Sequence, residues 1–201
     1  FEVFRERLAK NGMLHQANDF FRATGAHTVL QYKEVNESLL RTRNSGGFQL
    51  LGLADFPGQG SAFVGILDAF WESKGLVTPE KFRESCAPTV LLARLPKRTF
   101  RNGEKLKAKM EIYHFGKDAL NSRKLNWTLT GEDGIVYHKG SLKTKSIQPA
   151  TVDSLGIIEL PLNGMDSALK LTLKAELGGI HNEWDVWVYP EQPKTEQYNF
   201  V

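Results

Sequence analysis

The feature that most constrains this chain is a short apolar run, FQLLGL, at residues 48–53. It follows three small residues and is almost continuously apolar, which is typical of a strand buried on both faces of a parallel sheet. Such a strand needs hydrogen-bonded neighbours on both edges, because each buried unpaired backbone group costs about 1–3 kcal/mol. The run is therefore predicted to be an interior strand. Its neighbours would come from sequence before Phe1, from a second copy of the chain, or from the β-rich second half.

The loop at residues 55–61 is polar and rich in glycine and proline. The carboxyl ends of buried parallel strands are where α/β proteins place their ligands, so this loop is the predicted ligand-facing segment. Asp55 and Gln59 offer donors and acceptors for hydroxyl groups, and Phe56 and Trp71 offer apolar ring faces. The alternative is that Asp55 forms a local turn and that the two aromatic rings are packing residues.

Two stretches of the chain resemble a known family. The run FQLLGLADFPGQGSAFVGILDAFWESKG and the later LARLPKRTF, within residues 46–100, resemble the C-terminal region of glycoside hydrolases related to family 2, the β-galactosidase-like enzymes. The resemblance implies that residues 48–53 are the eighth strand of a (β/α)8 barrel, that a helix closes this barrel, and that an immunoglobulin-like β-sandwich follows. It also implies a carbohydrate substrate.

The same resemblance implies that no catalytic residue lies in this chain. Retaining glycosidases use two carboxylates about 5–5.5 Å apart, one as general acid/base and one as nucleophile. In the family these are glutamates on the fourth and seventh barrel strands, which would lie upstream of Phe1. The fragment alone is expected to be inactive, and the parent is expected to be a secreted, periplasmic or cell-surface enzyme.

The two halves of the chain show different periodicities. Residues 1–43 carry apolar positions at helical spacing, and Thr78-Pro79 is a helix start signal before a stop at Pro88. Beyond it, apolar and polar residues alternate in strand after strand with turn signals between them. We therefore predict an α+β chain of two parts. Residues 1–88 would be a mostly helical fragment of the barrel, residues 89–192 an antiparallel Ig-like β-sandwich, and residues 193–201 a tail.

Composition excludes several other classes. The 26 Lys and Arg against 23 Asp and Glu give a charge of +3, too small to indicate a nucleic-acid partner. Three lysines alternate along one strand, at 105, 107 and 109, and are interpreted as a solvated face. The single cysteine, Cys86, precludes an intrachain disulfide, and five scattered histidines show no metal-ligand spacing. No cofactor, metal or membrane span is expected.

A second hypothesis is a noncatalytic β-sandwich module that binds carbohydrate or protein. In the strand at residues 183–189, Trp184 faces opposite to Trp187 and Tyr189. A binding module predicts that the latter two rings are exposed and coplanar. The hydrolase interpretation predicts that they pack within the sandwich or against the barrel.

Overall fold

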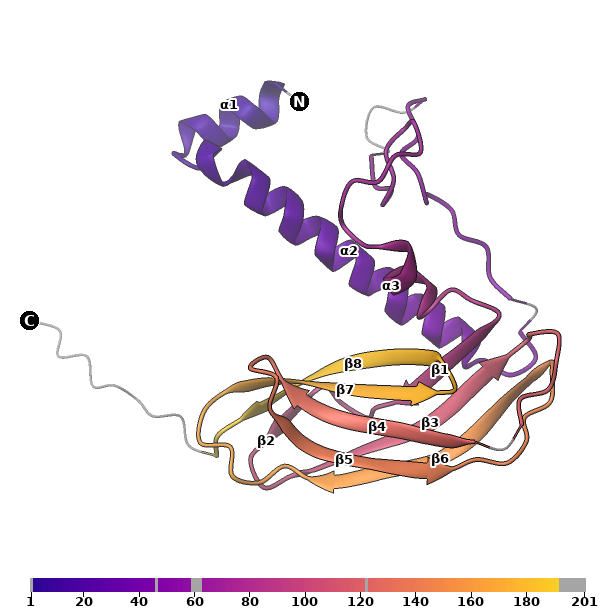
Figure 1. Ribbon diagram of the computed structural model, residues 1–201. Helices are drawn as coiled ribbons and strands as arrows, with labels where there is room; N and C mark the ends of the chain where they lie inside the picture. The colour runs from indigo at the N-terminus through magenta and orange to yellow at the C-terminus, as the bar shows by residue number, and fades with distance from the viewer. Residues whose placement is uncertain (1, 46, 59–62, 122, 192–201) are drawn as a thin grey trace, which may run out of the picture. The chain divides into compact units, whose positions relative to one another are not determined.

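The computed structural model describes residues 2–45, 47–58, 63–121 and 123–191 (Figure 1). The chain divides into two compact units, Phe1–Cys86 and Ala87–Val201. This division lies two residues before the boundary predicted at 88/89. Gln59 and the predicted tail at 193–201 fall outside the described residues. The two units are described separately below.

The first unit begins with helices, as predicted. Helix α1 (Glu2–Lys10) is followed by a 3-10 turn η1 (Leu14–Gln16) and by the long helix α2 (Ala17–Leu40). Helix α2 continues through Gly25, where a Cβ would lie only 2.3 Å from a methyl carbon of Leu76. A larger residue at this position would require the Leu76 side chain to move, so Gly25 marks a close contact with Leu76 rather than a break in the helix.

A short helix, α3 (Pro79–Arg83), closes the first unit. Its start confirms the prediction: Thr78 has extended dihedral angles, and its hydroxyl accepts a hydrogen bond from the Lys81 backbone N–H at 3.2 Å. Proline is the first helical residue, where its missing N–H has no intrahelical partner to lose. The cap and the proline together fix where this helix begins.

The predicted strand at 48–53 is wrong. The chain bends at positions 51 and 53, Gly52 has a φ of +83°, and the Leu51 side chain is 93% exposed. The physical reason is the backbone: a strand buried on both faces requires flanking strands, and no strand precedes Thr89 among the described residues. The helix that the resemblance implies after this run is also absent from residues 63–71. The described residues therefore do not show a (β/α)8 barrel fragment.

The second unit is a β-sandwich, as predicted. One sheet has the order β1-β3-β6 and the other the order β2-β8-β7-β4-β5 (Figure 1). All neighbours are antiparallel except β2 and β8, which are parallel. The strands are β1 (Thr89–Arg94), β2 (Thr99–Arg101), β3 (Lys105–His114), β4 (Lys124–Gly131), β5 (Val136–Lys143), β6 (Thr151–Pro161), β7 (Leu169–Leu177) and β8 (Ile180–Tyr189).

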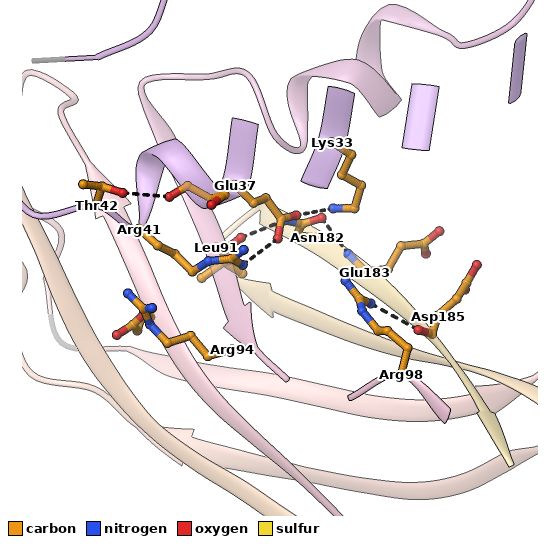
Figure 2. A network of polar contacts seen from close by, with 12 residues as sticks. Lys33, Glu37, Arg41, Thr42, Leu91, Arg94, Arg98, Asn182, Glu183 and Asp185 are labelled. Atoms are coloured by element: carbon orange, nitrogen blue, oxygen red, sulfur yellow. Dashed lines mark hydrogen bonds and ion pairs between the residues drawn. The ribbon is translucent and has the colours of Figure 1, made fainter. Parts of the chain in front are cut away.

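The core of the sandwich lies between the two sheets. Inward-facing residues of the strands form one apolar cluster, with Trp184 and Phe100 as its largest members, and Tyr137 and Leu142 of β5 pack against it. The buried Asn182 side chain of β8 donates a 2.7 Å hydrogen bond to the Leu91 carbonyl of β1, as Figure 2 shows. This bond connects β1, an edge strand of one sheet, to β8 of the other sheet. It gives the buried amide a hydrogen-bond partner at a position where the two sheets share no backbone hydrogen bonds.

The lysine row on β3 is a solvated face, as interpreted from the sequence. Lys105 and Lys107 lie 3.5 and 3.9 Å from the carboxylate oxygens of Glu159, and Lys109 lies 3.1 Å from Glu111. These cations are paired with carboxylates on the same sheet, which leaves little free positive charge for a polyanion.

We expect Trp184→Ala to lower the free energy of unfolding of the second unit by about 3–5 kcal/mol, because the ring is fully buried in the core. Trp187→Ala, three residues along the same strand but on the exposed face, is the matched control and should cost much less. Urea unfolding followed by circular dichroism measures both. Equal losses would contradict the inward and outward assignment of the two rings.

Candidate functional site

Asp55 holds two loops of the first unit together. Its Oδ1 accepts a 2.9 Å hydrogen bond from the Gly65 backbone N–H and a 2.7 Å bond from Lys74 Nζ. Lys74 Nζ also donates to the Gly65 carbonyl at 2.9 Å. Both side chains are nearly buried, with 7% of Asp55 and 14% of Lys74 exposed. The pair is therefore a structural clamp, and its charges compensate each other away from water.

The clamp works because the two loops approach closely. A Cβ at Gly65 would lie 2.5 Å from backbone atoms of both Ala54 and Asp55, so no larger residue fits without moving the chain. On either side of this contact the backbone is paired: the Asp55 N–H donates to the Leu67 carbonyl at 3.1 Å, and the Leu67 N–H donates to the Leu53 carbonyl at 3.0 Å. These bonds make one short parallel bridge between the loops.

A second carboxylate builds the loop that carries Trp71. Oδ1 of Asp68 accepts from the backbone N–H groups of Phe70 and Glu72 at 2.8 and 2.9 Å. The Asp68 N–H bonds to the Glu72 carbonyl, and the Trp71 N–H bonds to the Asp68 carbonyl. Trp71 has a φ of +68°, which is unusual for a residue with a bulky side chain. The hydrogen bonds around Asp68 hold this residue in place.

The segment that these carboxylates organise exposes its apolar side chains. Phe70 and Trp71 are 84% and 69% exposed, and Phe56 is 57% exposed with its ring against Gly58. The large exposed apolar residues of the segment are Leu51, Phe56, Phe63, Val64, Phe70 and Trp71. Exposed apolar groups gathered in one ordered segment mark a surface for a ligand or for another polypeptide.

Helix α2 supports the same segment from one side. The Tyr32 hydroxyl donates a 3.0 Å hydrogen bond to the Gly52 carbonyl, and the Tyr32 ring meets the Phe82 ring edge-on at 6.5 Å. Burial raises the pKa of the Tyr32 phenol, so its hydroxyl remains a donor at neutral pH. The contact fixes Gly52 at the point where the sequence predicts a buried strand.

The same helix carries a buried carboxylate near its C-terminal end. Glu37 is buried and pairs with Lys33 and with Arg41, each one helical turn away (Figure 2). Both cations lie at the spacing that lets side chains meet on one face of a helix. The two cations compensate the charge of this carboxylate away from water, which suits a structural role.

The structure places the predicted ligand residues in different environments. Asp55 points into the clamp, whereas Phe56 and Trp71 lie on the surface, and Gln59 lies outside the described residues. Sequence reasoning missed Lys74, for which the signal is that it is the only Lys or Arg between Arg43 and Lys81. It also missed Gly65, which looks like an ordinary loop glycine.

Other chemistry is limited in the part of the chain that the structure describes. No group of three or more His, Cys, Asp or Glu residues is placed to hold a metal ion there. Within the same residues, no helix has both the length and the apolarity needed to cross a membrane. Burial raises the pKa of the Cys86 thiol, although Arg83 partly opposes the shift, so the thiolate is a minor species at neutral pH.

Comparison with known proteins gives one family and several distant structural matches. A family described as a domain of unknown function (DUF8488) matches residues 104–190, which lie within the β-sandwich. No curated protein matches the chain. Among solved structures, the chain is similar to the sporulation control protein Spo0M of Bacillus subtilis, with 17% identity, a TM-score of 0.39 and coverage of 53% of this chain and 50% of that chain.

Two of the similar structures are glycosidases. One is a β-glucuronidase from glycoside hydrolase family 2, with 7% identity, a TM-score of 0.34 and coverage of 50% of this chain and 11% of that chain. The other is a β-glucosidase from Listeria innocua, with 13% identity, a TM-score of 0.37 and coverage of 52% and 16%. The chain spans half or less of the length of these proteins, and similarity at this level does not decide a function.

We expect Asp55→Ala to raise the hydrogen-exchange rate of the Gly65 amide at least tenfold, because that N–H loses its acceptor and Lys74 loses its counter-charge. Asp55→Asn keeps an acceptor oxygen and should retain part of the protection. Glu72→Ala, an exposed carboxylate in the same segment, is the control and should leave the Gly65 amide unchanged. Equal exchange in all three variants would show that Asp55 does not join the loops.

Proposed function

We propose that this chain is the noncatalytic C-terminal region of a β-galactosidase-like retaining glycoside hydrolase. In this proposal the first unit docks on a catalytic (β/α)8 barrel, and an Ig-like sandwich follows it. The two catalytic glutamates belong to the part of the protein upstream of Phe1. The parent enzyme hydrolyses O-glycosidic bonds in oligo- or polysaccharides outside the cytoplasm, at the cell surface or in the periplasm.

The observation that carries the proposal is the set of exposed apolar side chains at residues 51–58 and 63–71, which we call the apolar segment. Its backbone is fixed by Asp55 and Asp68, so its side chains stay outward in a defined arrangement instead of collapsing into a core. An ordered surface of this kind is suited to a second structured body. A barrel wall is such a body, and the sequence resemblance covers this same segment.

The structure changes the roles that we assign within the sugar site. Asp55 is engaged by Lys74 and Gly65, so we assign it to loop positioning rather than to sugar hydroxyls. Trp71 and Phe56 remain the candidates for contact with a pyranose ring, because their rings are exposed on the fixed loops. Gln59 stays a proposed hydrogen-bonding partner of the substrate.

The test compares residues 1–201 with the longer polypeptide that includes the region before Phe1. The longer polypeptide should hydrolyse an aryl β-galactoside with retention of anomeric configuration, whereas residues 1–201 should give no rate above the uncatalysed reaction. In the longer polypeptide, Trp71→Ala should lower kcat/KM by about 10–100-fold, because a ring that stacks on the sugar is lost.

Phe4→Ala is the control in this assay, because Phe4 is an exposed aromatic residue of α1 far from this segment in sequence. It should leave kcat/KM unchanged. Hydrolysis by residues 1–201 alone would refute the upstream placement of the carboxylates. A longer polypeptide without glycosidase activity would refute the proposed function itself.

A further inference from the structure

The outward face of β8 carries a second aromatic pair, in the other unit. Trp187 and Tyr189 are 38% and 47% exposed, whereas Trp184, Val186 and Val188 of the same strand are buried in the core. Residues two apart on a strand share a face and are about 6.6 Å apart along it. The sandwich core therefore does not require either outer ring, and both are presented side by side on the surface of the five-stranded sheet.

Polar side chains surround this pair. The backbone of Trp187 lies in register with Lys170 of β7 on one side and with Thr99 of β2 on the other, and Tyr189 lies in register with Arg101. Because paired residues in a sheet point to the same face, these side chains flank the two rings. The rings are thus bordered by an ammonium, a hydroxyl and a guanidinium group.

The polar border next to Trp187 is held in place by its own hydrogen bonds. Asp185 precedes Trp187 by two residues on the same face, and its Oδ2 lies 3.1 Å from Lys170 Nζ. Its Oδ1 accepts a 2.8 Å bond from the Thr172 hydroxyl. Figure 2 shows Arg98 donating to the Asp185 main-chain carbonyl, at 3.1 Å. The carboxylate beside the ring is therefore fixed before any ligand arrives, which lowers the entropic cost of binding.

The charges of this border compensate each other to a large extent. Lys170 Nζ lies between Asp185 and, at 3.6 Å, Glu132. Its hydrogen bond to Asp185 raises the pKa of the Lys170 ammonium, so this group stays charged at neutral pH. A polyanion requires cations that are not already neutralised, and Lys170 does not meet this requirement. A neutral ligand with many hydroxyl groups does find both donors and acceptors here.

We infer that the Trp187–Tyr189 face is a binding site for a neutral glycan chain. The apolar side of a pyranose ring lies against an indole or phenol ring, while its hydroxyl groups reach Asp185, Lys170 and Thr99. The inference rests on the proposed function for the class of ligand, since the glycan would be one that the parent enzyme degrades. The site needs no contribution from the first unit.

The test measures binding of residues 1–201 to soluble neutral polysaccharides, namely β-galactan, xylan and glucomannan, by affinity electrophoresis and calorimetry. At least one of these polymers should bind. Trp187→Ala and Tyr189→Ala should each weaken that binding at least tenfold, and the double variant should abolish it. Asp185→Asn, which keeps one acceptor oxygen but removes the charge, should weaken it less than Trp187→Ala does.

Two control variants separate this site from other exposed rings. Phe115→Ala removes a ring with similar exposure outside the five-stranded sheet, and Phe4→Ala removes an exposed ring of α1 in the first unit. Neither should change the affinity. Near-ultraviolet circular dichroism of each variant shows that the fold is retained.

Several outcomes would overturn the inference. They are a lack of binding to every neutral polymer, binding that Trp71→Ala rather than Trp187→Ala removes, and binding confined to acidic polymers such as polygalacturonate and lost in high salt. Concentration-dependent dimerisation that Trp187→Ala abolishes would instead identify a protein interface.

The inference and the proposed function fail separately. Trp187→Ala in the longer polypeptide should leave hydrolysis of a small aryl β-galactoside unchanged, because that substrate does not need the sandwich face. Glycan binding without any glycosidase activity in the longer polypeptide would refute the proposed function alone. Activity without glycan binding would refute the inference alone.

Discussion

A β-strand is stable only where its backbone N–H and C=O groups are paired, and this constraint divides the chain. From Thr89 to Tyr189 every strand finds its neighbours within the same unit, and the two sheets bury a common core. Residues 48–53 have strand-like composition but no flanking strand among the described residues, and they bend and expose Leu51. The strands of the second unit therefore meet this constraint within their own unit, whereas residues 48–53 do not form a strand.

In the first unit, specific polar bonds hold the loops in place. Asp55 and Lys74 join two loops, Asp68 shapes a third, and the Tyr32 hydroxyl ties Gly52 to α2. Each bond contributes only modestly in water, but removing one partner of a nearly buried pair leaves an uncompensated charge. The result is an ordered segment whose aromatic rings face outward. Hydrogen bonds rather than a large apolar core determine its shape.

Two exposed aromatic surfaces follow from this division, one on each unit, and both have features suited to sugars. Trp71 and Phe56 sit on loops fixed by carboxylates, and Trp187 and Tyr189 sit on a sheet with a bonded polar border. Loops and a flat sheet face differ in what they can do. Loops can close around a single sugar unit, whereas an exposed strand face suits several units of an extended chain.

The sequence by itself determined the features that depend on local patterns. Period-two alternation gave the strands from β3 to β8, the Thr78-Pro79 pair gave the start of α3, and strand parity separated Trp184 from Trp187. These features are predictable because side-chain direction in a strand and capping at a helix end involve only neighbouring residues.

Only the tertiary structure decided the conformation of residues 48–53 and the partner of Asp55. Whether an apolar run becomes a strand depends on hydrogen bonds to segments far away in the sequence, and no local pattern encodes their presence. The bond between Asp55 and Lys74 joins residues 19 positions apart, and a Cβ at Gly65 would lie only 2.5 Å from the backbone of Ala54 and Asp55. Contacts of this kind arise from packing, so composition and spacing do not reveal them.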